Sequence, residues 1–454
     1  MRITWIQPED NLLHEFDQAA AEGKQFDDLR DRWLDAGGAP TIGRQGASEH
    51  SPGRALVSLA RNLLAELDTR PPSPAIAAAE PREWDAIRTT WLSDPMELPR
   101  PDPDELTHRI AGAWTGRLVG CLIGKAVEKI PRAGIAEILI SSGQWPLRGY
   151  ITAAGVPAEV TERYPWNKAS RTHSLAENID GMPEDDDVNY TLLALDLLER
   201  RGRDFSTDDV AAGWFRTLPP GLLFTAERVA YRNLLDALPI AEVAVTANPF
   251  REWIGAAIRT DLYGWVNPGR PSAAAEMAWR DAYLSHTGSG LYSAMANAAM
   301  AAAAVAGADP DDVLGAGRSV VPPGSRLAAV LGQAATWGRQ QLSDDAGLDR
   351  LHHAYGSLHW VHAANNAALV AYGVARHGHD FGSAVALTAT SGWDTDSAGA
   401  TLGGVVGAIG GPDSIDARWT TPIGDRVHTS LPGFAGVTLP ALIERTVVAA
   451  GAGR

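Results

Sequence analysis

From Glu105 onward, apolar stretches with helical spacing alternate with stops made of Gly, Pro and Asp. Few segments show the period of two that a half-buried β-strand requires. Since the hydrophobic period decides which element can bury an apolar face, we predict that this part of the chain is mainly α-helical. The clearest predicted helices span residues 226–238, 273–283, 293–305, 325–336, 363–374 and 438–449.

Eight prolines lie between Arg70 and Pro103, where they remove amide donors and stop helices. We therefore divide the chain into an N-terminal accessory region with a proline-rich linker, residues 1–103, and a catalytic domain, residues 104–454. The 454 residues are enough for one large domain and an extension. Within the accessory region we predict a short strand over 2–6 and helices over 11–22 and 26–34.

The charge and cysteine content exclude several classes of function. A formal net charge of -16 repels phosphate backbones and anionic lipid heads, so we expect no nucleic-acid partner and no membrane surface. The start of the sequence lacks the apolar core of a signal peptide, and the alanine-rich stretch 294–308 is too short for a membrane span. Cys121 is the only cysteine, which excludes an intrachain disulfide and fits a cytoplasmic protein.

Four consecutive acidic residues, 184–187, precede a segment whose apolar residues recur at i, i+4 and i+7 from Val188. A helix is predicted to begin just after the acids, with Asp185 or Asp186 as its cap. Adjacent carboxylates repel one another, and the helix dipole offsets only about 0.3 to 1 kcal/mol per charge. A solvated acidic turn would explain such a run by itself. A bound divalent cation would stabilise it more strongly.

A second acidic pair, Asp394 and Asp396, marks the predicted start of another helix. With the hydroxyls of Thr395 and Ser397, the pair offers only hard oxygen donors, which suit Mg²⁺, Ca²⁺ or Mn²⁺ better than Zn²⁺ or Cu²⁺. Because a matching acidic cluster exists elsewhere in the chain, we favour metal ligation over a simple helix cap.

Glycines recur every four residues along the helix predicted after this pair, at Gly399, Gly403, Gly407 and Gly411. Each glycine inside a helix costs about 0.8 to 1 kcal/mol relative to alanine. The stripe therefore predicts that another backbone packs closely against this helix.

Three segments together resemble the motifs of ADP-ribosylglycohydrolases. Residues 185–192, Asp-Asp-Asp-Val-Asn-Tyr-Thr-Leu, resemble the family's Thr-Asp-Asp-Thr-x-Met-x-Leu. Residues 392–397, Gly-Trp-Asp-Thr-Asp-Ser, resemble Gly-Gly-Asp-Thr-Asp-Thr, and residues 120–128, Gly-Cys-Leu-Ile-Gly-Lys-Ala-Val-Glu, resemble Gly-Asp-Ala-x-Gly-x-Pro-x-Glu. The order of the motifs also agrees, and the likeness covers roughly residues 105–450.

The resemblance implies an orthogonal bundle of many helices that holds two divalent cations, Mg²⁺ or Mn²⁺, in a cleft. It implies that Glu128 approaches the metals and the substrate as a catalytic group, with Asp187 as the second catalytic candidate. Glu184 is an alternative ligand if the first motif shifts by one residue. The metal ligands implied by position are Asp185, Asp186, Asp187, Asp394, Asp396 and Ser397.

Departures from the family pattern leave the substrate open. Cys121 replaces the usual aspartate, Ala126 a proline, Val188 a threonine, and Trp393 a glycine beside the metal acids. We therefore expect Trp393 to face the substrate, although most of the tryptophans of the chain belong to the core.

A glycine-rich segment around residues 285–295 resembles the family's phosphate-binding loop only in part, because it lacks the expected Asn and Arg. On this basis His286, Gly288, Ser289 and Gly290 are candidate substrate contacts, with an ordinary helix start as the alternative.

Four histidines lie close together in the sequence, and two of them are spaced at i, i+3. The group lacks a third ligand at a recognisable spacing, so we favour a polar helix face over a zinc site. The histidines are His352, His353, His359 and His362.

The predicted function is hydrolysis of an N- or O-linked ADP-ribosyl or related ribosyl bond, in a small molecule or a protein conjugate. Such cleavage builds positive charge on the anomeric carbon, and two cations can orient ribose hydroxyls and activate water. Two alternatives stay open: a hydrolase of a small nucleoside-like riboside, and a non-catalytic homologue that binds ADP-ribose.

Overall fold

The structure is a computed structural model and describes residues 2–42 and 46–451. Within these ranges the regular elements are α-helices and short 3-10 helices, and the only β-pairing consists of isolated bridges. The prediction of a mainly α-helical chain is confirmed. No described helix is both long and apolar enough to cross a membrane.

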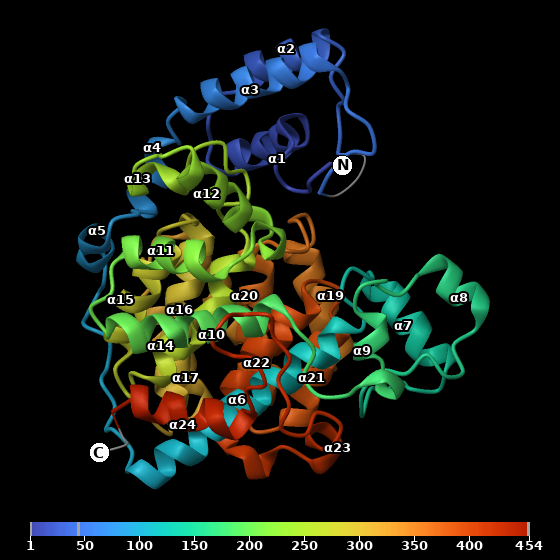
Figure 1. The fold of residues 1–454 in the computed structure, drawn as a ribbon, viewed down its shortest axis with the longest axis vertical. Helices are drawn as coiled ribbons and strands as arrows, with labels where there is room; N and C mark the ends of the chain where they lie inside the picture. The colour runs from blue at the N-terminus through green and yellow to red at the C-terminus, as the bar shows by residue number, and fades with distance from the viewer. Residues whose placement is uncertain (1, 43–45, 452–454) are drawn as a thin grey trace.

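Two helices, α6 (Pro103–Lys125) and α22 (Thr395–Gly410), pack against each other in the middle of the molecule (Figure 1). A Cβ atom on any glycine of the shared stripe would overlap a backbone carbonyl of the other helix, which confirms the close backbone approach predicted from the sequence. The stripe pairs Gly112 with Gly407, Gly116 with Gly403, and Gly120 with Gly399. Gly411 is not part of α22, which ends at Gly410. Gly411 is instead the residue that caps the C-terminus of α22, with a φ of 71°.

The remaining helices of the body surround this pair and share one large apolar core. All six helices predicted most clearly from the sequence are present, and most of their ends differ from the prediction by three residues or fewer. The surrounding helices are α10 (Asp186–Arg201), α11 (Thr207–Thr217), α12 (Thr225–Leu235), α13 (Ile240–Val243), α14 (Asp261–Trp265), α15 (Pro271–Ala282), α16 (Gly288–Val305), α17 (Pro310–Ser319), α18 (Arg326–Gly338), α19 (Asp344–Tyr355), α20 (Ala363–His377), α21 (Phe381–Ala389), α23 (Ala417–Thr420) and α24 (Leu439–Ala449), with the 3-10 helices η2 (Pro220–Leu222), η3 (Ile254–Arg259) and η4 (Pro412–Ser414).

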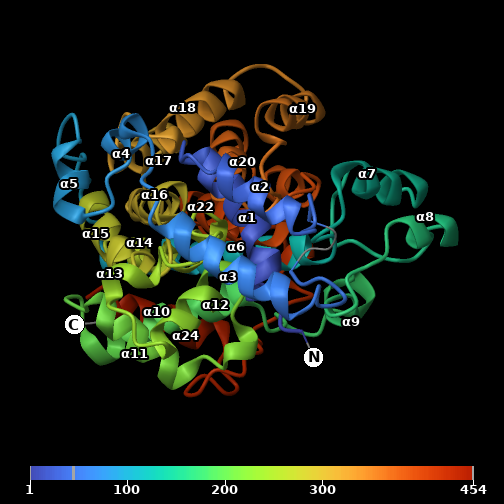
Figure 2. The same ribbon diagram turned by 90° about the horizontal axis from the view of Figure 1, so that it is seen from above.

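A smaller group of helices projects from one side of the body, as both ribbon views show (Figures 1 and 2). It follows α6 in the chain and leads into α10, so it connects the helix that precedes Glu128 to the helix that begins at the first acidic motif. The group consists of α7 (Arg132–Ser141), α8 (Ala158–Arg163), α9 (Arg171–Ser174) and η1 (Ala176–Asn178).

The N-terminal region lies across one end of the body and has a small apolar core of its own (Figures 1 and 2). Its first two helices were predicted from the sequence, but the predicted strand over 2–6 is wrong, since the chain turns at Trp5 with a φ of 64°. The helices are α1 (Pro8–Ala21), α2 (Asp27–Asp35) and α3 (Arg54–Asp68), followed by the short α4 (Pro74–Ala79) and α5 (Trp84–Thr89).

Buried ion pairs fix this region to the body. The guanidinium of Arg251 donates to both carboxylate oxygens of Glu15, at 2.7 and 2.9 Å, and to Glu22 at 2.8 Å. Arg326 pairs with Glu80 at 2.7 Å. Burial disfavours the charge of Arg251, but the two carboxylates outweigh that cost and raise its pKa. The accessory region is therefore docked on the body rather than loosely tethered to it.

Candidate metal centre and active site

A cavity of about 810 Å³ opens where the starts of α10 and α22 meet the end of α6. Its polar lining includes Glu128, Asp185, Asp186, Asp394, Asp396 and Ser397, which the sequence analysis had placed in one site. A second cavity, of about 620 Å³, lies against α19 and α21 and contains neither acidic motif. The chemistry of the first cavity is therefore the relevant one.

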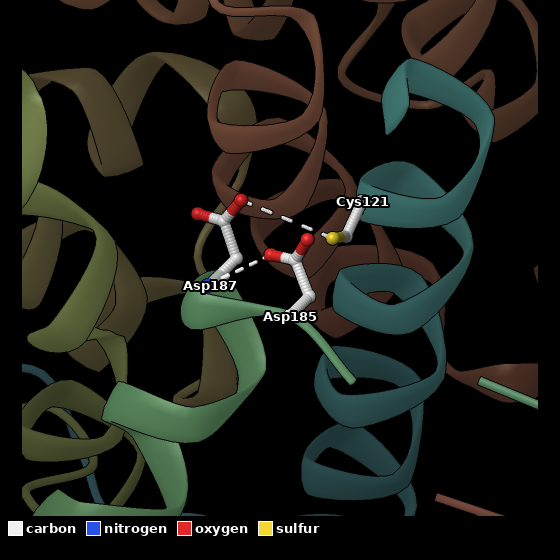
Figure 3. A group of neighbouring side chains, drawn as sticks. All are labelled: Cys121, Asp185 and Asp187. Atoms are coloured by element: carbon white, nitrogen blue, oxygen red, sulfur yellow. Dashed lines mark hydrogen bonds between the residues drawn. The ribbon is translucent and has the colours of Figure 1, made fainter. Parts of the chain in front are cut away.

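The first acidic motif forms the start of α10. Asp185 is the N-cap, and its Oδ1 accepts the backbone N–H of Asp187 at 2.9 Å (Figure 3). Its other oxygen pairs with the ammonium of Lys125 from the end of α6. Burial opposes ionisation of Asp185, but Lys125 outweighs it and lowers the pKa of this carboxyl. The predicted cap is confirmed, and it is already paired with an internal cation.

Asp187 points into the interior and is only 1% exposed. Its Oδ2 accepts the hydroxyl of Ser397 at 3.3 Å and lies 3.8 Å from the Cys121 thiol (Figure 3). Its Oδ1 is buried and has no hydrogen-bond partner among the described residues. A buried carboxylate oxygen without a partner is costly, so a cation or a proton at this oxygen would be favourable.

The second acidic motif forms the start of α22, as predicted. The Thr395 hydroxyl donates to the carbonyl of Gly124 at 2.8 Å, which joins the start of α22 to the end of α6. The backbone N–H of Asp394 donates to the amide oxygen of Asn366 at 3.3 Å. Because the glycine stripe lets α6 and α22 approach so closely, this junction brings Asp396 beside the first motif.

Glu128 lies in the turn just after α6. One of its carboxylate oxygens, one of Asp394 and one of Asp396 all lie within 4.8 Å of one another. Its Oε2 accepts the amide of Asn167 at 3.1 Å, and its Oε1 lies 2.9 Å from the Lys129 ammonium. Three acids from two separate sequence motifs thus form one group.

The gathered carboxylates disfavour one another's charge. Burial, followed by the charges of neighbouring carboxylates, raises the pKa of Asp186, Asp187 and Asp394 well above the ordinary value. The same two causes raise the pKa of Asp396 to about 7, with the charge of Glu128 as the largest contribution after burial. A site that holds several acids against this repulsion is suited to bind cations.

The donor set fits hard divalent cations. Two groups of three side chains could each hold an ion, one built on Asp185 and Asp187 with Cys121, the other on Glu128, Asp394 and Asp396. Burial raises the pKa of the Cys121 thiol well above its usual range, so oxygen donors dominate the first group. Carboxylate and hydroxyl oxygens are the ligands that Mg²⁺ and Mn²⁺ prefer.

Glu184, the alternative ligand, also lines the cavity, but its carboxylate is already engaged. Its Oε1 accepts the backbone N–H of Ser430 and the amide of Asn189, both at 3.0 Å. These contacts connect the start of α10 to the C-terminal part of the chain. The other three acids of the first motif, Asp185, Asp186 and Asp187, do not bind Ser430 or Asn189 through their side chains.

The segment that resembles the family's phosphate-binding loop lies outside the lining of the 810 Å³ cavity. Gly288, Ser289 and Gly290 begin α16, and the backbone N–H of Ser289 donates at 3.0 Å to the carboxylate of Glu252. His286 is fully buried beside them. None of these four candidates belongs to the described residues that line the 810 Å³ cavity. An internal carboxylate therefore fills the position at the start of α16 where an anion would bind.

Trp393 is buried against the body rather than facing the cavity. Its ring stacks on that of His352 with centroids 4.3 Å apart, and it is absent from the described lining residues. The other histidines do not gather around a shared centre: His359 stacks on Trp253 at 4.1 Å, and His362 caps α20. Within residues 2–42 and 46–451, no histidine belongs to a group that could hold a metal.

Several lining residues were not recognised from the sequence, among them Trp5, Lys125, Asn167, Tyr190 and Trp360. Lys125 lies within the motif that ends at Glu128, so its place beside the acids could have been proposed. Trp5 gives no such signal, because it lies about a hundred residues before the first motif and reaches the cavity only through the docking of the N-terminal region.

The structure is a body of α-helices in which the starts of two helices present carboxylates to one cavity. The family model for ADP-ribosylglycohydrolase matches residues 102–449, and the chain belongs to this family. Membership supports a glycohydrolase activity. Solved structures that match include one described as "ADP-ribosylglycohydrolase-related protein complex", at 21% identity and a TM-score of 0.47, covering 76% of this chain and 98% of that chain. No curated protein matches.

Proposed function

We propose that the protein is a cytoplasmic, metal-dependent hydrolase of ribosyl N- or O-glycosidic bonds, with two Mg²⁺ or Mn²⁺ ions held in the acid-lined cavity. The observation that carries this proposal is the meeting of both acidic motifs and Glu128 at one cavity. The buried, unpartnered Oδ1 of Asp187 supports it further. A solvated acidic surface would not need carboxylates from three segments around one cavity, several of them buried.

The residues that would hold the ions are Asp185, Asp186, Asp187, Asp394, Asp396 and Ser397; of the five aspartates, Asp186 lines the cavity but belongs to neither group of three. When bound, divalent cations would orient the vicinal hydroxyls of a ribose and lower the pKa of a water molecule. Ser397 donates to Asp187 at 3.3 Å and so holds one carboxylate in place.

Glu128 is the proposed acid-base group. Its carboxylate lies between Asn167, which donates to it at 3.1 Å, and the acids of α22, so it can accept a proton from a water molecule on that side of the cavity. The surrounding carboxylates would stabilise the positive charge that develops on the anomeric carbon during cleavage.

The metal requirement can be tested by thermal unfolding. Chelator-treated protein should gain melting temperature on addition of Mg²⁺ or Mn²⁺, because a ligand that binds only the folded state stabilises it. Asp396→Asn should abolish that gain, whereas His359→Ala, on a residue stacked against Trp253, should retain it. If the treated protein neither holds metal nor responds to it, the proposed function is wrong.

One observation favours a nucleoside-like riboside over an ADP-ribosyl conjugate. The carboxylate of Glu252 occupies the start of α16 and is itself held at 2.7 Å by both Gln18 and Arg326. A substrate phosphate would have to displace this carboxylate. A turnover screen with ADP-ribosyl conjugates and free nucleosides, each with Mg²⁺ and with Mn²⁺, separates the two substrate classes, and turnover of neither would favour a non-catalytic binding protein.

A further inference from the structure

The wall of the cavity contains a residue from outside the family match. Trp5 lines the same cavity as the acids, together with Phe224, Ile254 and Trp360. The matched segment begins at residue 102, so Trp5 belongs wholly to the N-terminal region. The ring is partly exposed and makes edge contacts with Phe250 and Trp253, at centroid distances of 5.4 and 5.7 Å.

The backbone at Trp5 is held in an uncommon conformation. Its φ of 64° is in the left-handed region, which a bulky residue rarely adopts. The N–H of Trp5 donates to the carbonyl of Gly46 at 2.6 Å, and its carbonyl accepts the amide of Asn11 at 3.3 Å. Arg228 of α12 donates to the preceding residue, Thr4, at 3.0 and 2.7 Å. The N-terminal region and the body therefore both fix this turn, as expected of a preorganised binding residue.

The charges around the cavity restrict what could bind against this ring. Among the described lining residues are eight acidic side chains, two lysines, two histidines and no arginine. Both lysines are already paired, Lys125 with Asp185 and Lys129 with Glu128. A phosphate group would find no arginine and no unpaired lysine on this wall, whereas an uncharged aromatic ring would find apolar and aromatic surface.

We propose that Trp5 contacts the planar aromatic group of an uncharged ribosyl substrate, so that the N-terminal region supplies a specificity-determining residue to the cavity. The proposal rests on the function proposed above. It assigns the ribose to the acid-lined part of the cavity and the aromatic ring to the part lined by Trp5 and its apolar neighbours. The N-terminal region is then part of the active site and not only an accessory.

Calorimetry with adenosine and with D-ribose, with and without Mg²⁺, tests this assignment on the full chain. Loss of an aromatic stacking partner should weaken adenosine binding by about tenfold or more in Trp5→Ala, and ribose binding should not change. Trp5→Phe should recover most of the affinity. Trp5→Leu keeps apolar bulk against Trp253 but lacks a ring, so it should also bind adenosine about tenfold or more weakly. It tests the proposal if the alanine variant folds poorly.

Trp91→Ala is the matched control, because Trp91 is also in the N-terminal region but bonds to the carbonyl of Val320 and is not a described lining residue. It should bind adenosine as the unchanged protein does. The proposal is overturned if Trp5→Leu binds adenosine with normal affinity, or if the unchanged protein binds adenosine and ribose with equal affinity. Absence of a metal-dependent rise in melting temperature would instead refute the proposed function, and the two failures are distinct.

Discussion

Glu128 differs from the other acids of the cavity, because it comes from the turn after α6 and not from the start of a helix. In Glu128→Gln the side chain keeps its shape and can still accept the Asn167 amide. The variant loses the charge and therefore the ion pair with Lys129. Because Lys129 is 55% exposed, this pair contributes about 0 to 1 kcal/mol to stability. We expect turnover to fall by about 10² to 10⁴-fold while the melting temperature changes little.

The control for this variant is Glu137→Gln, which removes an exposed carboxylate on α7 that pairs with Arg163. It should leave both turnover and stability unchanged. Near-normal turnover of a well-folded Glu128→Gln protein would reject the acid-base role and leave the aspartates to supply the base.

Asp68, at the end of α3, gives the interface of the N-terminal region a pH dependence. Its carboxylate accepts the backbone N–H of Ala247 at 3.0 and 3.2 Å, and burial, followed by the charge of Glu15, raises its pKa from 3.8 to about 6. The folded state therefore binds this proton more tightly than the unfolded state. The contribution of Asp68 to the free energy of unfolding is greatest below about pH 4 and falls as the pH rises through about 6.

Asp68→Asn should remove this pH dependence, because the amide oxygen still accepts the Ala247 N–H and carries no charge. At about pH 7 the variant should be more stable than the unchanged protein by about 1 to 3 kcal/mol, and at about pH 4 the two should be equal. Urea unfolding at both pH values measures the difference. A difference that is the same at both would show that the Asp68 charge is not responsible.

The acidic residues of the site could be predicted one by one because they are clustered in the sequence. A solvated turn would explain the run 184–187 by itself, and only the second acidic pair, Asp394 and Asp396, favoured a metal site; the structure brings both clusters to one cavity. Trp5 and Glu252 could not be predicted. Their positions depend on contacts between segments more than two hundred residues apart, such as the 2.7 Å bond between Gln18 and Glu252.

The pair α6 and α22 is where element packing sets the geometry of the site. A Cβ atom on Gly116 would overlap the carbonyl of Gly403 and come within 3.2 Å of the Phe381 ring. The backbones would have to separate, which would also move the start of α22 and its acids. We expect Gly116→Ala to destabilise the protein by at least about 1 to 3 kcal/mol and to reduce its metal-dependent stabilisation.

Gly213→Ala is the matched control, because Gly213 lies inside α11 with no atom within 4 Å of the position of its Cβ. There the helix propensity of alanine acts alone, and the variant should be more stable by roughly 0.5 to 1 kcal/mol. Urea unfolding of both variants separates the two effects. Equal results for the two glycines would contradict the close packing of α6 on α22.

Helices with a strong apolar period were predictable as elements, and so was the glycine stripe that joins two of them. The helix α3 was not predicted, although Leu56, Leu59, Leu63 and Leu67 recur in it at helical spacing. The helix α16 was predicted over 293–305 but begins at Gly288, and the glycines at its start indicate a helix start or an anion site equally well. Only the position of Glu252 decides between them.

At the scale of the whole molecule, the proline-rich boundary separates two segments of sequence but not two independent bodies. The family match begins at residue 102. Across that boundary, however, Arg251 is buried between Glu15 and Glu22, and Arg326 pairs with Glu80. Prolines reveal where helices stop along the chain, whereas these contacts depend on tertiary structure.

Cutting the chain between the two segments tests how they are held together. Leu92 is 90% exposed and lies in the connection between α5 and α6, so a protease site placed there should be cleaved without unfolding the protein. We expect the two pieces to elute as one species in size-exclusion chromatography, with the metal-dependent rise in melting temperature preserved. After cleavage, the buried ion pairs of Arg251 would hold the two pieces together.

Glu15→Gln combined with Glu22→Gln should release the N-terminal piece after cleavage, because a buried guanidinium left without a carboxylate costs about 3 to 5 kcal/mol. Glu66→Gln is the control, since its pair with Arg32 is exposed and lies within the N-terminal region itself. That variant should stay associated. If the unchanged protein separates on cleavage, the ion pairs do not hold the region in place, and Trp5 would reach the cavity only through the covalent connection.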